Sequence, residues 1–203
     1  MLSWCKAPSL FLLSALLLTR SAAGPFSDIQ KGNICFEAAA YLASEGFITG
    51  PGDGAFHPED TITAAEYLTL LYRVSSFYGI CSGHDTTGQN WQQAAGFLAG
   101  RMGLGLTVPD EPLTRDRFSF FTAAFLCLSE DYHRKIYLRR PYTPFADTHL
   151  STYPEELGFL QSVGAVPGWG DTGNKHLFFP SEPVSRGEAL LTTLNILQNL
   201  ILV

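Results

Sequence analysis

Two arginines, Arg115 and Arg186, hold matching positions at the start of predicted helices, where they are well placed to bind an anion. Each follows a residue that can cap a helix, Thr114 or Ser185, so each occupies the first helical position. A cation there faces the positive end of the helix macrodipole and is mildly unfavourable. A guanidinium beside free first-turn N–H groups, however, makes a good anion site. Because the arrangement occurs twice, anion binding and a solvated surface role are evenly balanced.

Both arginines belong to a helix-start motif that occurs three times. Its pattern is proline, three residues, an apolar residue, Thr or Ser, two residues, and then Glu or Arg. Glu66 and Glu188 lie three residues after the capping Thr63 and Ser185, where they complete a capping box. The copies are named the first, second and third motif: Pro58–Glu66, Pro109–Arg117 and Pro180–Glu188.

Carboxylates and histidines show no arrangement typical of catalysis or metal binding. A further helix is predicted before each motif, and we call it the first helix of that copy. Asp28, Asp85 and Asp147 each lie just before such a helix, where they can cap it or close an Asx turn. Both roles are compatible with ligand binding. Hydrolysis of glycans needs two placed carboxylates, and the other acids fall mainly in caps and turns. No Gly-x-Ser-x-Gly, His-Glu-x-x-His or phosphate-binding loop is present. We therefore expect no enzyme activity, no cofactor and no metal site.

The first 23 residues have the features of a secretory signal peptide. Lys6 lies before an apolar run, 10–18, which is followed by the small residues Ser21, Ala22 and Ala23. We expect cleavage before Gly24. An uncleaved membrane anchor is the less favoured alternative because the apolar run is short for a span. No later stretch is long and apolar enough to cross a bilayer.

The net charge limits the classes of partner, and the spacing of the cysteines limits the roles that they can have. Without residues 1–23 the net charge falls from −6 to −8, with 11 basic residues against 19 acidic ones. This argues against nucleic acid or an anionic membrane surface as a partner. Cys35, Cys81 and Cys127 lack zinc-site spacing. Cys35 and Cys81 either form a disulfide between antiparallel helices or stay free as small buried thiols.

Paired helices are the elements that must position these residues. Apolar residues at spacings of three and four predict the second helix of each copy: 64–77, 115–129 and 186–200. The first helix of each copy ends at a glycine that can supply a left-handed C-cap: Gly46, Gly103 or Gly164. We expect an all-α chain divided into a signal peptide (1–23), a first copy (24–80), a second copy (81–130), a charged connector (131–144) and a third copy (145–203).

Residues 26–66 resemble an S-layer homology (SLH) repeat. They carry, in order, Phe-x-Asp, a helix, Gly-Phe-Ile-Thr-Gly, Asp-Gly-x-Phe-x-Pro and Ile-Thr-x-x-Glu. Residues 145–188 resemble a second such repeat, in which Val184-Ser-Arg-Gly-Glu188 matches the family's Thr-Arg-Ala-Glu, and residues 84–128 resemble a weaker one. The resemblance implies three helix-loop-helix repeats around a pseudo-threefold axis. One helix of each repeat builds a central bundle, and grooves lie between the repeats.

The resemblance also implies a function and a set of site residues. Such repeats bind bacterial secondary cell-wall polysaccharides non-covalently, often glycans with pyruvate ketals. The chain is then a secreted protein of the cell wall or S-layer with an anionic glycan as its partner, and a surface protein is a further candidate partner. The family's ligand-binding positions correspond here to Arg186, Arg115, Asp28, Asp85, Asp147, Gly50, Gly168 and Trp91.

The chain departs from the family pattern at several of these positions. Ala64 replaces the arginine of the first motif, and Arg117 replaces the glutamate of the second. The aromatic residue early in the first helix is kept only as Trp91, with Ile34 and Thr152 in the other copies. At most two grooves then keep the pattern, with the third motif the best preserved. The alternative is a structural or protein-interaction module of the cell surface that has lost glycan binding.

Overall fold

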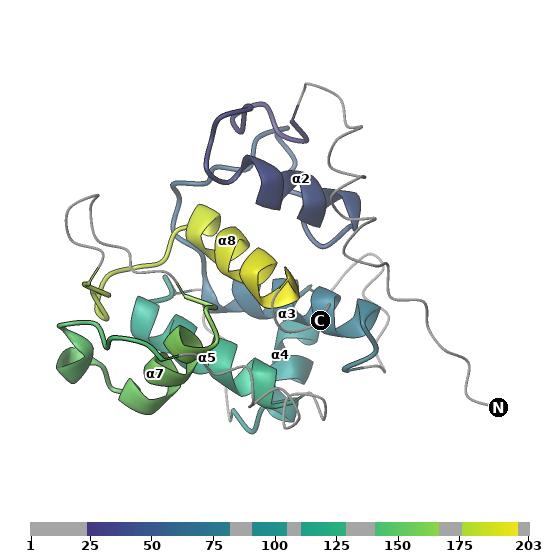
Figure 1. The fold of residues 1–203 in the computed structure, drawn as a ribbon. Helices are drawn as coiled ribbons and strands as arrows, with labels where there is room; N and C mark the ends of the chain where they lie inside the picture. Colours follow the sequence, from purple (N-terminus) through teal and green to yellow (C-terminus); the bar gives the residue numbers. More distant parts are fainter. Residues whose placement is uncertain (1–23, 82–90, 105–110, 129–140, 167–175, 199–203) are drawn as a thin grey trace.

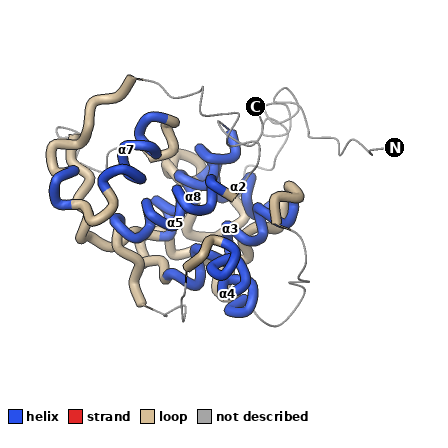
Figure 2. Tube along the Cα trace, turned by 90° about the horizontal axis from the view of Figure 1, so that it is seen from below, coloured by secondary structure: helices blue, strands red, loops and turns tan. Residues whose placement is uncertain are grey.

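The computed structural model of the chain describes residues 24–81, 91–104, 111–128, 141–166 and 176–198. Within these ranges the expected all-α fold is confirmed, since the regular elements are helices joined by loops (Figures 1 and 2). The expected signal peptide and most of the expected connector lie outside the described residues. The helices are α2 (Phe36–Ser44), α3 (Ala64–Phe77), α4 (Trp91–Arg101), α5 (Arg115–Cys127), α7 (Pro154–Ser162), α8 (Arg186–Ile196) and a short 3-10 helix, η2 (Thr148–Leu150).

The three helix-start motifs cap α3, α5 and α8 as predicted. The cap hydroxyl accepts from the amide N–H three residues later, at 3.2 Å for Thr63, 3.4 Å for Thr114 and 3.1 Å for Ser185. Glu66 and Glu188 accept in return from the cap N–H, at 3.0 and 2.8 Å, which completes both predicted capping boxes. These bonds satisfy first-turn groups that have no partner inside the helix.

The glycines predicted to end the first helix of each copy have the expected left-handed conformation. Gly46, Gly103 and Gly164 adopt φ values of 76°, 71° and 72°, the left-handed conformation that glycine adopts without steric cost. α3 has the predicted bounds. α5 ends at Cys127 and α8 at Ile196, short of the predicted residues 129 and 200, and the structure describes neither 129–140 nor 199–203.

Helices of different copies pack against one another in a closed order. α3 of the first copy packs against α4 of the second, and α5 of the second packs against α7 of the third. α8 of the third copy packs against α2 of the first, and Figure 1 shows this C-terminal helix beside the N-terminal one. Each second helix therefore covers the first helix of the following copy, and the last copy returns to the first.

The three motifs meet in a ring of backbone hydrogen bonds. Ile62 N–H donates to the Val184 carbonyl, Val184 N–H to the Leu113 carbonyl and Leu113 N–H to the Ile62 carbonyl, each at 2.9 Å. All three side chains are buried. Buried backbone groups need partners, and here each motif supplies a partner to the other two. This contact joins segments from all three copies.

α3 and α5 meet in the core through Tyr67. Tyr67 is fully buried, and its ring lies against Phe118 with centroids 4.4 Å apart. Its hydroxyl lies 2.8 Å from Oγ1 of Thr122, so the polar end of the buried tyrosine is satisfied. Burial raises the pKa of Tyr67, which keeps the hydroxyl neutral.

The three cysteines of the described residues are free thiols. Cys35 and Cys81 are buried and unpaired, so of the two alternatives left by the sequence the structure has the free thiols. Cys127 is exposed. Among the described helices, none has both the length and the apolar character needed to cross a membrane.

Candidate ligand pocket between the three copies

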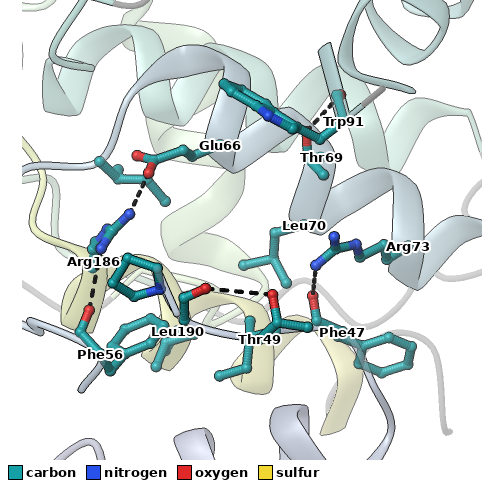
Figure 3. Close-up of a pocket in the computed structure, with 14 residues that line it drawn as sticks. Phe47, Thr49, Phe56, Glu66, Thr69, Leu70, Arg73, Trp91, Arg186 and Leu190 are labelled. Atoms are coloured by element: carbon teal, nitrogen blue, oxygen red, sulfur yellow. Dashed lines mark hydrogen bonds and ion pairs between the residues drawn. The ribbon is translucent and has the colours of Figure 1, made fainter. Parts of the chain in front are cut away.

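A pocket of about 330 Å³ opens where parts of all three copies meet (Figure 3). The loop 47–51 of the first copy forms one wall, and α3 forms another. The second copy contributes Trp91, the first residue of α4, and the third contributes Arg186 and Leu190 of α8. The volume lies in the range of pockets that hold small ligands.

Three of the residues predicted from the sequence come together in this pocket. Gly50 belongs to the first copy, Trp91 to the second and Arg186 to the third, and all three line it. They are far apart in sequence, so the packing of the copies alone makes them neighbours. The other predicted residues of the described part, Arg115, Asp28 and Asp147, do not line this pocket.

Gly50 is required by the backbone of the pocket wall. It adopts φ 67°, and a Cβ there would lie 2.8 Å from the Ala55 carbonyl oxygen and 2.9 Å from the Phe26 ring. A side chain would therefore be opposed both by the left-handed conformation and by its neighbours. The glycine lets the loop lie close to Phe26.

Trp91 is an exposed aromatic residue of the pocket lining. Its side chain is large, apolar and 41% exposed, which is unusual for a residue at the start of a packed helix. The Thr69 hydroxyl lies 2.9 Å from the Trp91 carbonyl oxygen, which ties the start of α4 to α3. An exposed indole fixed in this way offers a flat surface on which the face of a sugar ring can pack.

Arg186 is held by the first copy from three sides. It donates through Nη2 to Oε1 of Glu66 and through Nη1 to the Phe56 carbonyl oxygen, at 3.2 Å for the latter. Its guanidinium also lies over the Phe56 ring, 5.9 Å from the centroid. The ion pair neutralises the charge that the sequence assigned to an anionic ligand.

The first-turn N–H groups beside both motif arginines are occupied, which corrects the sequence argument for an anion site there. Arg186 N–H donates to the Asp60 carbonyl oxygen and Gly187 N–H to that of Pro58, both at 2.8 Å. In the second motif, Arg115 N–H donates to the Glu182 carbonyl oxygen at 2.9 Å. The reason is that the first motif docks on the start of α8 and the third motif on the start of α5, and local sequence does not contain these contacts.

Arg115 repeats the arrangement of Arg186 at another junction. Its Nη2 lies 2.7 Å from Oε1 of Glu188, and the two side chains are only 13% and 19% exposed. Each motif arginine therefore reaches the capping-box glutamate of the next copy. In this order the third pair would join residues 64 and 117, which are Ala64 and Arg117. Ala64 stands where the other two motifs have an arginine, and Arg117 stands where they have a glutamate. Arg117 instead lies over the Phe121 ring, 5.6 Å from its centroid.

Asp28 binds the backbone at Phe56, a residue of the pocket lining. Its two carboxylate oxygens accept from Phe56 N–H at 2.8 Å and from His57 N–H at 2.7 Å. Burial acts to raise the pKa of Asp28, but the two N–H bonds outweigh it and the pKa lies below its ordinary value. The carboxylate fixes the peptide whose carbonyl binds Arg186. Asp28 therefore holds a distant loop. The sequence had allowed it to cap the adjacent helix, and it does not do so.

Asp147 plays the same part in the third copy. Its carboxylate accepts from Phe178 N–H at 2.9 Å and from Phe179 N–H at 2.7 Å. His57 and Phe179 both adopt positive φ, 58° and 57°, so the two carboxylates stabilise the same uncommon backbone conformation. The remaining predicted residues, Asp85 and Gly168, lie outside the described residues.

Arg73 is a pocket residue that sequence reasoning missed. It is partly buried on α3 and donates through Nη1 to the Phe47 carbonyl oxygen at 3.0 Å. Burial lowers its pKa, because a desolvated cation is less stable than a solvated one. Its signal in the sequence is that it is the one charged residue of α3 after Glu66. The apolar periodicity of that helix concealed it.

The described residues form an all-α fold with a small pocket lined by segments of all three copies. Residues 25–68 match the family model of the S-layer homology domain. Domains of this family generally take part in anchoring proteins to the cell wall. The match contains Asp28, Gly50 and Glu66, whereas Trp91 and Arg186 lie beyond it. A comparison with curated proteins finds no match. In the described part of the chain no group of three or more His, Cys, Asp or Glu residues is placed to hold a metal ion.

Proposed function

We propose that this protein attaches non-covalently to the bacterial cell wall by binding an anionic secondary cell-wall polysaccharide, with a pyruvylated glycan as the favoured ligand. The observation that carries the proposal is the pocket between the copies, in which Gly50, Trp91 and Arg186 come together beside the segment that matches the SLH family. The protein would be secreted and would lie at the cell surface.

We further propose that the domain consists of three SLH repeats, residues 24–80, 81–130 and 145–203, around a pseudo-threefold axis. The family match covers the first repeat alone. The ring of hydrogen bonds between the motifs and the closed order of helix packing support the other two. Two of the three junctions also repeat one ion pair, from a motif arginine to the capping-box glutamate of the next copy, which is a pattern expected of a cyclic repeat.

The chemistry of the pocket supports an anionic sugar. The exposed Trp91 ring can pack on a sugar face, and the pocket wall also carries the hydroxyl-bearing residues Thr49 and Thr69. Two arginines and one glutamate line it, an excess of one positive charge within a chain of net charge −6. A pocket with excess positive charge favours a ligand that brings a carboxylate to it.

We infer a binding role without catalysis, cofactor or metal. Glu66 is the carboxylate among the residues that line the pocket, and it is ion-paired with Arg186. A glycosidase needs a second carboxylate at a defined separation across the bond that it cleaves. The described pocket therefore offers no pair of groups for acid–base chemistry on a glycan.

A structural or protein-interaction module is the second candidate. Both motif arginines, Arg115 and Arg186, already bind capping-box glutamates, and this role alone explains their positions. In that case the repeats are kept for their fold, and the partner is another protein of the cell surface.

Sedimentation with purified cell walls tests the proposal. We expect residues 24–203 to co-sediment with walls of the source organism and to remain in the supernatant after acid removal of the secondary polymer. Circular dichroism would establish that the protein used is folded. Absence of binding to untreated walls, with dimerisation in solution, would favour the structural module.

A further inference from the structure

The charged groups of the pocket are not equivalent. Arg186 is paired with Glu66, so these two residues together contribute no net charge. Arg73 has no ion-pair partner among the described residues, and its one hydrogen bond there goes to a neutral carbonyl oxygen. The excess positive charge of the pocket therefore resides on Arg73.

Figure 3 shows the two arginines on opposite sides of the pocket, with Leu70 between them. Arg186 points toward Glu66 and Phe56. Arg73 points toward the loop that carries Phe47 and Thr49, on the side away from Glu66. A carboxylate next to Arg73 would therefore lie apart from the acidic side chain of the pocket.

Of the two arginines in the pocket, Arg73 would be stabilised more by a bound anion. The lowered pKa means that burial has already removed part of the hydration of its guanidinium without supplying an opposite charge. A guanidinium donates up to five N–H bonds, and Arg73 uses one of them within the described residues. A bound carboxylate could accept two in parallel, the strongest geometry for this pair.

We propose that Arg73, and not the motif residue Arg186, binds the carboxylate of the glycan, and that Arg186 positions the pocket wall. This inference rests on the proposed function and assigns the residue that selects an acidic over a neutral sugar. The ligand is a sugar that carries one carboxylate, with the sugar face on Trp91 and the carboxylate at Arg73.

The other copies lack this cation. Counting seven residues from the last residue of each motif, the equivalent of Arg73 is Ala124 in the second copy and Asn195 in the third. Arg73 therefore distinguishes the first copy at this position, although segments of all three copies line the pocket that contains it.

Calorimetry with a defined sugar tests the assignment. The probes are a synthetic methyl glycoside carrying a 4,6-linked pyruvate ketal and the methyl ester of the same compound, which is neutral and nearly the same shape. We expect the parent to prefer the acid, and Arg73→Gln to lose about 10- to 100-fold in affinity for the acid and to bind acid and ester alike. Arg73→Lys should keep part of the preference because it keeps the charge.

Arg101→Gln is the matched control, since Arg101 is an exposed arginine at the end of α4 and its loss changes the net charge equally. It should bind like the parent. Thermal melting would establish that each variant is folded, and the wall sedimentation assay repeats the comparison on the natural polymer. A preference for the acid that persists in Arg73→Gln, or a parent that binds both probes equally, would overturn the inference alone. A parent that binds neither the probes nor untreated walls would overturn the proposed function with it.

Discussion

Gly50 shows how one residue can set the wall of the pocket. Replacing it with alanine adds a Cβ to a left-handed residue beside the Ala55 carbonyl oxygen and the Phe26 ring. We expect Gly50→Ala to lower the free energy of unfolding by about 1–3 kcal/mol, measured by urea denaturation. Gly96→Ala is the control, because Gly96 lies inside α4 with open space around its Cβ position. It should be neutral or stabilising.

Asp28 links a single carboxylate to the pH dependence of stability. Its pKa is lowered in the folded state, so its contribution is present above the unfolded pKa, about 3.9, and is lost as the pH falls through the folded pKa. We expect Asp28→Asn to melt below the parent at neutral pH and the difference to shrink in acid. Melting temperatures of both proteins across the acid range measure this.

Glu59→Gln serves as the control for that series. Glu59 is exposed, and its side chain makes no hydrogen bond or ion pair within the described residues. A melting difference between Asp28→Asn and the parent that stayed constant down to low pH would mean that the carboxylate charge is not what holds the Phe56–His57 peptide.

At the scale of the element, the capping-box glutamates have two functions at once. Glu188 accepts from the Ser185 N–H of its own helix and from Arg115 of the second copy. Glu188→Ala removes both acceptors and leaves Arg115 without this partner, so we expect a loss of about 3–5 kcal/mol in unfolding free energy. Glu188→Gln keeps a neutral acceptor and should cost less. Equal losses in urea denaturation would show that the charge of Glu188 is unimportant.

The sequence was sufficient for the starts of α3, α5 and α8 and for the glycine caps, but not for the ends of α5 and α8 or for the partners of the charged groups. Thr63 and Gly46 act within a few residues of themselves, so local spacing predicts them. Arg186 binds a glutamate 120 positions away, and no local pattern contains that contact. Arg73 lies within an apolar helix, where periodicity identifies the buried face but does not identify a cavity beside it. The position of Asp28 before a predicted helix marks it in the sequence, but its partner is a distant loop.

At the scale of the whole molecule, residues 64 and 117 are the two positions that the cyclic order of the motifs would pair. They carry Ala64 and Arg117, where the other two junctions have an arginine and a glutamate. Ala64→Arg alone would place a second guanidinium near Arg117, whereas Ala64→Arg with Arg117→Glu would recreate the ion pair found at the other two junctions. A double-mutant cycle on unfolding free energies should give a favourable coupling of about 0.5–1 kcal/mol. The cycle cancels the separate effects of each change, including the loss of the Arg117–Phe121 contact.

Arg115→Gln with Glu188→Gln removes an existing pair and provides the reference cycle. Its coupling should have the same sign as that of the introduced pair. Zero coupling at residues 64 and 117, with a clear coupling in the reference cycle, would mean that these two positions do not face each other.

A ring of motifs fails differently from a linear array. In an open array each repeat touches only its sequence neighbours, so repeats can be removed from the end and the rest survives. Here two of the three hydrogen bonds of the ring involve Val184, and both ion pairs between motifs need the third copy. Folding must wait for contacts between distant parts of the chain, which slows it. One cut within the third copy would accordingly open the whole ring and, under the proposed function, would release the protein from the wall in a single step.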